Sequence, residues 1–312
     1  MLVKLSEAVW TQRKGVKLLT KVLGPDDIRW VGGAIRDSLL GKNVKDVDCA
    51  TKLHPDKVTE KCEKFGVKVI PTGLDHGTVT AVLEDGNIEI TTLRQDISTD
   101  GRRAKITFSE SWKDDASRRD FTINALYAHP ITYQIFDYYG GLEDLENKRV
   151  RFIGDPLKRI SEDYLRILRY FRFQARFGAQ FDLDADRACE ALATSIKGLS
   201  RERIAGEFLA LLTAENPHPV IVRMFDLGVM RQFLPETEKN NLDCLELLIN
   251  TESESRVSPN PMRRLAALLP PNDKIAEIVA SRFRLSKKQR KYLAMTARRE
   301  PNDLRNPEAL TY

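Results

Sequence analysis

The point at which β-type patterning stops constrains this fold more than any other feature of the sequence. Over about the first 150 residues, short apolar runs rich in β-branched residues alternate with turns and with stretches of helical periodicity. After the Gly-Asp-Pro sequence at 154–156, leucine, isoleucine, alanine and phenylalanine recur at helical spacing to the end of the chain. This change predicts an α+β fold, in which a head with a mixed sheet precedes an all-helical region.

The chain is long enough for more than one domain. At 312 residues we expect a head over residues 1–150, a helical neck over 151–215 and a helical body over 216–312. In the head, strands are expected at residues 28–31, 44–50, 67–71, 77–83 and 87–93, and helices at 3–22, 34–41 and 55–65. The Glu-Asp-Gly sequence between the last two strands is typical of a hairpin. The polar, glycine-containing residues 94–105 predict a mobile loop.

Two aspartates, Asp46 and Asp48, indicate a metal site. Alternate residues of a strand lie on one face, so their carboxylates are expected to stand side by side and to repel each other. A hard divalent cation such as Mg²⁺ is the natural neutraliser of such a pair, because no lysine or arginine follows within the strand. Glu89, on the predicted strand over 87–93, could complete a carboxylate cluster, or it could be a solvated residue on the outer face.

Two further segments could bind the phosphates and sugar of a nucleotide. The Gly-Gly turn that ends at Gly33 leads into a predicted helix, so its backbone N–H groups can bind an anion, and Arg36 adds positive charge. Asp120 is expected to cap a helix that begins at the next residue, and Arg119 before it could bind a ribose hydroxyl or a triphosphate oxygen. A capped helix with solvent-exposed arginines is the other interpretation of this segment. Metal carboxylates beside a phosphate cradle suggest phosphoryl or nucleotidyl transfer.

The helix expected over residues 161–176 carries an unusual row of charges. Ser161 is expected to be its N-cap, and acidic residues occupy its first turn, as the helix dipole favours. Four charged residues recur every three positions and would form a stripe along one side: Asp163, Arg166, Arg169 and Arg172. Asp163 and Arg166 present an acceptor beside a planar fork of donors, a combination that can match the hydrogen-bonding edge of a nucleobase. An intrahelical salt bridge is the alternative.

Composition argues against a membrane protein and favours a polyanionic partner. No apolar run approaches the ~20 residues that span a bilayer, and the N-terminal residues lack a signal-peptide core. The four widely spaced cysteines fit free thiols in a reducing compartment, so we expect a cytoplasmic protein without a zinc site. Basic residues gather over 158–176 and 282–299, and RNA is the simplest partner for two such patches.

In their order along the chain, these segments resemble the class II tRNA nucleotidyltransferases, the CCA-adding enzymes, and the related bacterial poly(A) polymerases. Residues 32–37 with Asp46 and Asp48 are similar to the family's catalytic motif, and residues 118–120 are similar to its ribose-recognising motif. The match runs nearly unbroken from about residue 30 to about residue 178.

Two other segments extend the resemblance. Residues 162–166 are similar to the helix on which an aspartate and an arginine act as a protein template for the incoming CTP or ATP. Residues 99–103 resemble the flexible loop associated with the switch from adding C to adding A, with Asp100 and Arg102 as its best candidates for contacts with the template helix.

The resemblance implies a polymerase-beta-like nucleotidyltransferase head that adds C, C and then A to the 3′ end of tRNA from CTP and ATP, with release of pyrophosphate. The residues implied to act are Asp46 and Asp48 as ligands of two Mg²⁺ ions, Glu89 as a further catalytic carboxylate, Gly33, Arg36, Arg119 and Asp120 at the triphosphate and ribose, Asp163 and Arg166 at the base, and Arg169 and Arg172 at the phosphates. The family's tail, which grips the tRNA elbow, would be largely absent after the body over 216–312.

Three alternatives share most of these features. A poly(A) polymerase would carry nearly every motif, and only the product made on tRNA or on mRNA-like primers separates the two. A CC-adding enzyme would need no functioning loop at 99–103, whose Asp-Gly-Arg-Arg sequence is intact here. A non-catalytic RNA-binding relative would not need Asp46 and Asp48. The sequence leaves the oligomeric state open.

Overall fold

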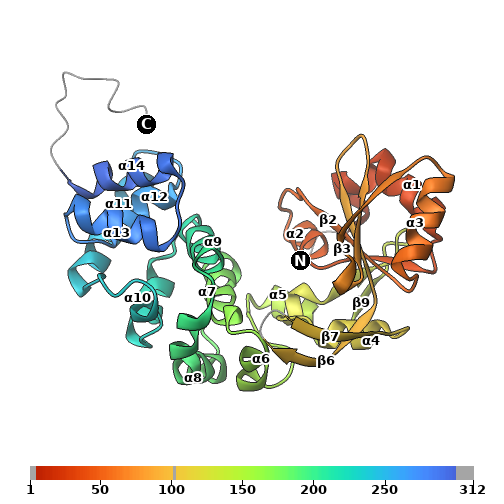
Figure 1. The fold of residues 1–312 in the computed structure, drawn as a ribbon, viewed down its shortest axis with the longest axis horizontal. Coiled ribbons are helices and arrows are strands. Elements are labelled where there is room, and N and C mark those ends of the chain that lie inside the picture. The colour runs from red at the N-terminus through yellow and green to blue at the C-terminus, as the bar shows by residue number, and fades with distance from the viewer. Residues whose placement is uncertain (1–4, 101–102, 300–312) are drawn as a thin grey trace. The chain divides into compact units, whose positions relative to one another are not determined.

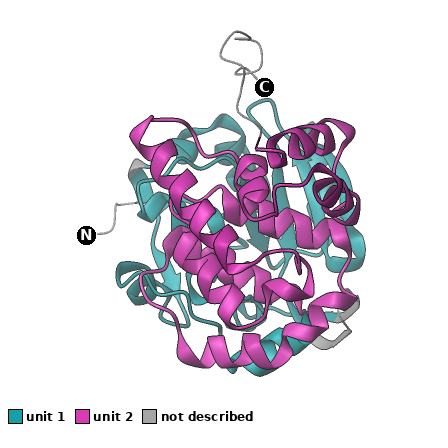
Figure 2. Cartoon of the chain, turned by 90° about the vertical axis from the view of Figure 1, so that its left-hand side faces the viewer, with its two compact units in different colours: residues 1–163 teal, residues 164–312 magenta. Residues whose placement is uncertain are grey.

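A seven-stranded mixed sheet lies at the centre of residues 1–163, and the described part of residues 164–312 is helical (Figures 1 and 2). This computed structural model describes residues 5–100 and 103–299. The two segments form separate compact units, called unit 1 and unit 2 below. The α+β architecture predicted from the sequence is confirmed, whereas the division into head, neck and body stays a prediction.

The sheet of unit 1 has the strand order β3-β4-β5-β2-β1-β8-β9. Its strands are β1 (Ile28–Val31), β2 (Val47–Thr51), β3 (Lys68–Gly73), β4 (Thr78–Val82), β5 (Ile88–Thr92), β8 (Leu126–Ala128) and β9 (Ile135–Asp137). Strands β2 and β5 run parallel, and the other neighbouring pairs are antiparallel. The predicted strands and the β4–β5 hairpin are therefore confirmed, although β2 begins at Val47, one residue after Asp46.

The segment over 94–105 is predicted as a mobile loop, but its described residues, 94–100 and 103–105, form strands instead. Strands β6 (Arg94–Asp100) and β7 (Arg103–Phe108) pair antiparallel as a separate two-stranded sheet. Ile97 and Thr99 alternate with polar residues in the first segment, as do Ala104, Ile106 and Phe108 in the second. With the Asp-Gly pair at the end of the first segment, this sequence is typical of a hairpin. Asp100 ends β6, and Arg102 lies outside the described residues, so their role in switching from C to A stays a prediction.

The helix predicted over 3–22 is also different, because a tertiary contact divides it. Two 3₁₀ turns, η1 (Leu5–Glu7) and η2 (Val9–Gln12), precede α1 (Lys14–Leu23). The turns bring Trp10 into the core, where its Nε1 donates to Ser38 Oγ at 2.8 Å and its ring meets Trp30 edge to face. Burial of a large indole with a satisfied N–H outweighs the regularity of one long helix.

Short helices make up most of the rest of unit 1. They are α2 (Gly33–Leu39), α3 (Pro55–Lys64), α4 (Trp112–Ser117), α5 (Gly141–Glu146) and α6 (Pro156–Glu162), with 3₁₀ turns η3 (Leu74–His76) and η4 (Thr122–Asn124). Helix α3 packs against α1, β3 and β4, while α2 packs against β1, β2 and β8 (Figure 1). The second arrangement places the start of α2 beside the edge of the sheet at which β1 ends and β2 begins.

The described part of unit 2 is all helical, as the sequence predicted. Its helices are α7 (Leu165–Phe177), α8 (Leu183–Leu192), α9 (Arg201–Leu212), α10 (His218–Asp226), α11 (Lys239–Glu254), α12 (Pro261–Ala267), α13 (Asp273–Arg282) and α14 (Lys287–Ala297), with 3₁₀ turns η5 (Ala193–Gly198) and η6 (Met230–Gln232). The buried rings of Phe208, Phe233 and Phe283 contact one another in its core. Among the described residues, no helix is both long enough and apolar enough to cross a membrane.

Candidate functional site

Three carboxylates gather where β2 and β5 lie side by side. Val47 and Cys49 are buried in the core, so the alternation of β2 leaves Asp46 and Asp48 exposed. In the parallel pairing of β2 with β5, Asp48 lies opposite Glu89, which is also exposed. Among the described residues, however, no three Asp, Glu, His or Cys side chains converge closely enough to hold a metal ion. The structure thus brings Glu89 near Asp48 without making it a third member of a preformed ligand set.

The charge at Asp48 is only partly compensated. Its pKa is raised above the ordinary aspartate value, first by desolvation of the carboxyl and then by the negative charges of Glu89 and Asp46, while Arg119 opposes them. Two exposed carboxylates with excess negative charge at one strand end fit a hard divalent cation, which prefers oxygen ligands. Asp46 and Asp48 therefore remain the residues that could hold such an ion.

The glycine turn before α2 lies close to an arginine from another segment. Gly32 has φ 72° and ψ −125°, a backbone conformation that residues with a Cβ rarely adopt, and its N–H donates to Leu126 O at 3.0 Å. A Cβ at this position would lie 3.5 Å from Asn124 O and 3.6 Å from Arg119 Nη1. The turn is thus packed against η4 on one side and faces a guanidinium on another.

Arg36 and Asp120 belong to a buried hydrogen-bond chain that supports this turn. Arg36 Nε donates to Asp37 Oδ1 at 2.8 Å, and its Nη1 donates to Asn124 Oδ1. Asn124 Nδ2 in turn donates to Asp120 Oδ1 at 3.0 Å. Because these side chains are almost fully buried, the structure places Arg36 and Asp120 behind the turn, and their direct contact with a nucleotide stays a prediction.

The helix expected after Asp120 is a single 3₁₀ turn. Phe121 occupies the N-cap position of η4, and Asp120 Oδ1 accepts from the backbone N–H of Phe121 at 2.9 Å instead of capping an α-helix. The preceding helix, α4, already ends at Ser117. The expectation of solvent-exposed arginines in this segment is also wrong, because Arg118 and Arg119 both pair with a buried acid.

That acid is Asp115, which the sequence reasoning did not single out. It is 1% exposed and pairs with Arg118 through Oδ1 at 2.8 Å and with Arg119 through Oδ2 at 3.1 Å. The Tyr127 hydroxyl donates to Oδ2 at 2.6 Å. Its spacing was the available signal, since an acid three and four residues before two arginines is the i,i+3 and i,i+4 pattern of a helical ion pair.

The Asp115 carboxylate should make stability depend on pH. Burial alone would raise its pKa, but Arg119, Arg118 and Tyr127 outweigh this effect and hold the pKa at about 2, below its ordinary value of 3.8. The stabilisation is therefore complete above the unfolded-state pKa and is lost as the pH falls through about 2.

We expect the free energy of unfolding of wild type relative to Asp115→Asn to fall by about 2 kcal/mol between about pH 5 and about pH 2. Denaturant titrations of both proteins across this range measure it. The asparagine variant does not titrate at this position, so an unchanged difference between the two proteins contradicts the assignment.

The predicted helix over 161–176 is divided at Asp163. Helix α6 ends at Glu162, Asp163 is extended with φ −152° and ψ 107°, and α7 begins at Leu165. Ser161 is not an N-cap, because its Oγ donates to Leu157 O in the last turn of α6. Asp155 caps that helix instead, with a proline at the following position, which explains its earlier start.

The three arginines of the stripe lie on α7, and two of them share an acid of α9. Arg166, Arg169 and Arg172 are half-buried. Arg172 Nε donates to Glu207 Oε2 at 2.5 Å, and Arg169 Nη1 donates to Oε1 at 3.4 Å. The guanidinium of Arg172 also lies over the Phe173 ring. One carboxylate of α9 thus holds two arginines of the row, Arg169 and Arg172.

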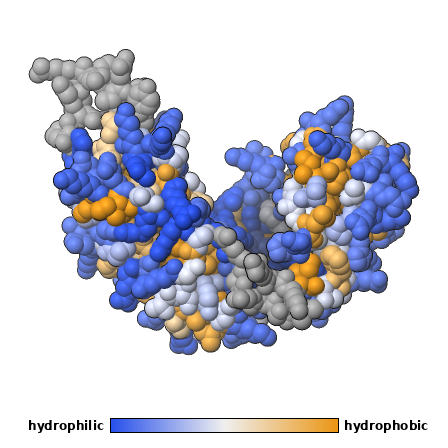
Figure 3. Space-filling view, in the orientation of Figure 1, coloured by the Kyte–Doolittle hydropathy of each residue, from blue (hydrophilic) through white to orange (hydrophobic). Residues whose placement is uncertain are grey.

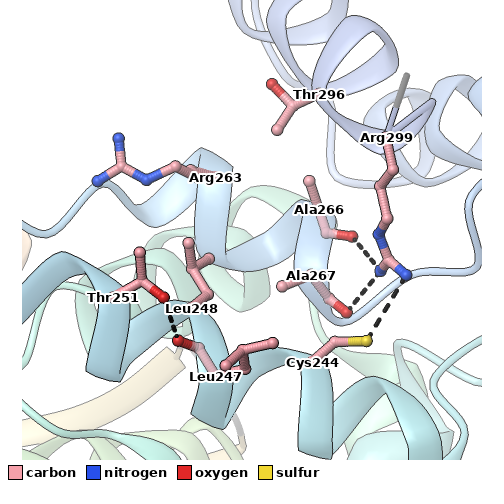
Figure 4. A pocket seen from close by; sticks show the side chains of 9 residues that line it. All are labelled: Cys244, Leu247, Leu248, Thr251, Arg263, Ala266, Ala267, Thr296 and Arg299. Carbon is pink, nitrogen blue, oxygen red and sulfur yellow. Dashed lines mark hydrogen bonds between the residues drawn. The ribbon is translucent and has the colours of Figure 1, made fainter. Parts of the chain in front are cut away.

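Unit 2 also contains a cavity and a basic surface helix. The cavity, of about 340 Å³, is lined mostly by apolar side chains of α11 and α12 (Figure 4). Arg299 at its rim donates to the carbonyls of Ala266 and Ala267, so its charge caps the end of α12 (Figure 4). Figure 3 shows a largely hydrophilic surface over this unit. On α14 the exposed cations are Lys287, Lys288, Arg290 and Lys291.

Two family models match the chain, one in each unit. Residues 28–151 match the poly A polymerase head domain. Residues 180–240 match a domain described as a probable RNA- and SrmB-binding site of polymerase A. The first match contains the glycine turn, Asp46, Asp48, Glu89 and the Arg119 segment.

The chain is also similar to individual proteins that are named as CCA-adding enzymes. A mitochondrial CCA tRNA nucleotidyltransferase 1 of Mus musculus is 38% identical over 89% of this chain, which spans 64% of the mouse protein. A CCA-adding enzyme of Staphylococcus epidermidis is 38% identical over 60% of the chain and 46% of its own length. A solved Thermotoga maritima CCA-adding enzyme complexed with tRNA has a TM-score of 0.71 at 23% identity, covering 91% of this chain and 69% of that one. A Bacillus stearothermophilus CCA-adding enzyme in complex with CTP has a TM-score of 0.63 at 25% identity, covering 91% and 76%.

Proposed function

Because this chain belongs to the family of tRNA nucleotidyltransferases and poly(A) polymerases, we propose that it adds C, C and A to tRNA 3′ ends from CTP and ATP. The observation that carries the proposal is the pair of exposed aspartates at the start of β2, next to a glycine turn that faces Arg119. Because its relatives are named for CCA addition, we take tRNA and not another RNA as the primer. A poly(A) polymerase and a CC-adding enzyme remain the alternatives.

The reaction is attack of the RNA 3′-hydroxyl on the nucleotide α-phosphate, which forms a P–O bond and releases pyrophosphate. Asp46 and Asp48 would hold two Mg²⁺ ions, which supply Lewis-acid stabilisation of the attacking and leaving oxygens. The backbone at Gly33 would bind the triphosphate, and Arg119 would donate to a triphosphate or ribose oxygen. Arg36 and Asp120 would keep the turn in place through Asn124.

Selection of the base is assigned to the segment around the break between α6 and α7. Asp163 and Arg166 would hydrogen-bond the edge of cytosine or adenine, and Arg169 and Arg172, held by Glu207, would neutralise phosphate charge. Fixed protein groups reject a base strongly when the mismatch leaves them buried and unpaired.

The templating role predicts a change in specificity for Asp163→Ala. Because Asp163 is assigned to the base and not to the phosphates, this variant should misincorporate UTP and GTP on the order of tenfold more often, with a smaller loss of CTP incorporation. Single-nucleotide incorporation assays on tRNA without its CCA end measure this ratio. Arg187→Ala, an exposed change on α8, is the control. Unchanged rejection of UTP and GTP in Asp163→Ala would remove Asp163 from base selection.

Product analysis tests the function as a whole. The protein is incubated with Mg²⁺ and tRNA ending before CCA, before the second C, or before A, and with one labelled nucleotide at a time. Ordered addition of two C residues and one A supports the proposal. Long A tails on tRNA or on an mRNA-like primer support a poly(A) polymerase, arrest after two C residues supports a CC-adding enzyme, and RNA binding without incorporation supports a non-catalytic relative.

The exposed cations of α14 are proposed to contact the RNA backbone, because a basic helix is a suitable surface for phosphates.

We also propose that the protein acts in the cytoplasm, since its described cysteines are free thiols, with Cys49, Cys62 and Cys189 buried. Mammalian relatives named as mitochondrial offer the competing location. Fractionation of cells that express a tagged chain tests the compartment.

A further inference from the structure

A buried acid and a phenol hold the Arg119 side chain in a closed triangle of hydrogen bonds. Arg119 Nε donates to the Tyr127 hydroxyl at 3.0 Å, and its Nη2 donates to Asp115 Oδ2 at 3.1 Å. The Tyr127 hydroxyl donates to the same Oδ2 at 2.6 Å. Asp115 and Tyr127 are at most 1% exposed, so water does not compete strongly for these bonds.

The neighbouring arginines complete this support without competing for it. Arg118 occupies the second oxygen of Asp115, with Nε donating to Oδ1 at 2.9 Å. Arg159 of α6 donates from Nη2 to the backbone carbonyls of Arg118 and Arg119, at 2.5 and 2.8 Å. The main chain and the side chain of Arg119 are thus both fixed within unit 1.

The third nitrogen of the guanidinium points elsewhere. Arg119 Nη1 lies 3.6 Å from the position that a Cβ on Gly32 would take. Within the described ranges, 5–100 and 103–299, it has no hydrogen-bond partner, although a guanidinium usually donates from all three nitrogens. Arg119 therefore presents one aimed donor group beside the glycine turn.

We propose that Asp115 and Tyr127 are positioning residues that aim Arg119 Nη1 at a phosphate oxygen of the nucleotide bound at the Gly32 turn. The inference rests on the proposed function, and it adds that neither residue touches the nucleotide. A guanidinium fixed before binding loses little freedom when it grips a phosphate, whereas a released one must be ordered by the substrate. Removing the Tyr127 hydroxyl frees one side of the guanidinium while keeping the ring in the core.

Tyr127→Phe is the sharpest variant, with Tyr138→Phe as its matched control. The Tyr138 hydroxyl also accepts from an arginine, Arg29 Nη1 at 2.7 Å. Its ring packs against the hydrophobic core cluster of unit 1 that contains Tyr127. We expect Tyr127→Phe to lower kcat/KM for CTP and ATP about tenfold and to leave the KM for tRNA unchanged. Tyr138→Phe should leave all of these constants near those of wild type.

A double-mutant cycle separates positioning from a general effect on the fold. In the Arg119→Ala background, Tyr127→Phe should cause no further loss, because the group that it aims is already gone. An additional tenfold loss in that background would overturn the proposal.

If Tyr127→Phe does not fold, Arg119→Lys decides the question. Lysine keeps the charge but cannot be gripped in the same way, so near-wild-type kcat/KM in this variant would also overturn it.

Direct binding distinguishes this inference from the proposed function. Calorimetric titration with inorganic tripolyphosphate and Mg²⁺ should show binding to wild type and about tenfold weaker binding to Tyr127→Phe. This result supports the positioning role even if wild type incorporates no nucleotide, in which case the proposed function alone fails. Equal binding by the two proteins, or no binding by wild type, overturns the inference.

Discussion

Replacing Asp46 or Asp48 with alanine is expected to reduce the incorporation of both C and A on the order of 10³-fold or more. Both side chains are exposed, while the neighbouring Val47 and Cys49 are buried. The fold should therefore tolerate either change, and the loss should appear in the chemical step. Single-turnover incorporation at saturating CTP or ATP measures that step, and circular dichroism checks the fold.

Three comparisons make the result specific to a metal site. Asp26→Ala removes a carboxylate that is 97% exposed in the same unit and should leave the rate unchanged. In Asp48→Asn, which keeps one oxygen ligand, raising the Mg²⁺ concentration should recover part of the activity. Glu89→Gln should slow incorporation less than either aspartate variant, because Glu89 lies opposite Asp48 outside a preformed ligand set. Near-normal rates in Asp46→Ala or Asp48→Ala would exclude the assignment.

Strands and their polar faces could be predicted because apolar and polar residues alternate along them in the sequence. From Asp46 into β2, Val47 and Cys49 alternate with Asp46 and Asp48, and the structure buries the first pair and exposes the second. The parallel neighbour of β2 could not be predicted in the same way. The pairing of Asp48 with Glu89 depends on strands that are separated by β3 and β4 in the chain.

Helix boundaries were predicted less well, because competing local signals decided them. Ser161 before two acids is typical of an N-cap, but Asp155 followed by Pro156 starts the helix six residues earlier. Helix α6 then ends at Glu162, so the proposed template aspartate lies in a break between helices. Hydrophobic periodicity continues through such a break and does not reveal it.

The partners of charged residues were the least predictable part of the site. Motifs identified Arg36, Arg119 and Asp120 as polar residues near a phosphate cradle, but burial distinguishes their roles. Arg36 and Asp120 are joined through Asn124, which lies far from Arg36 in sequence. Such long-range pairs depend on packing of α2 against η4, and a local sequence pattern does not predict that packing.

The largest stability effect is expected at Arg264 in unit 2. Arg264 is 1% exposed, and its Nε donates to Glu252 Oε2 at 2.8 Å. Its other nitrogens donate to the carbonyls of Leu212, Ala214 and Glu215, which follow the end of α9 or lie in its last turn. One side chain of α12 therefore ties α11 to the end of α9.

Arg264→Met should lower the free energy of unfolding by about 3–5 kcal/mol, because it leaves a buried carboxylate with one fewer partner and removes the donor to these carbonyls. Urea denaturation followed by circular dichroism measures the change. Adding Glu252→Gln to this variant should lower the free energy of unfolding by less than the same change does in wild type, since the carboxylate has already lost its buried partner.

The matched control for Arg264→Met is Arg187→Met on α8. Arg187 pairs with Asp184 at 3.5 Å, but the two side chains are 77% and 78% exposed, so water screens their attraction. This variant should change the free energy of unfolding by less than about 0.5 kcal/mol. Burial, and not the number of ion pairs, then sets the difference between the two arginines. Equal losses in both variants would mean that Arg264 acts through helix propensity or side-chain volume, and its contacts with Glu252 and the end of α9 would contribute little.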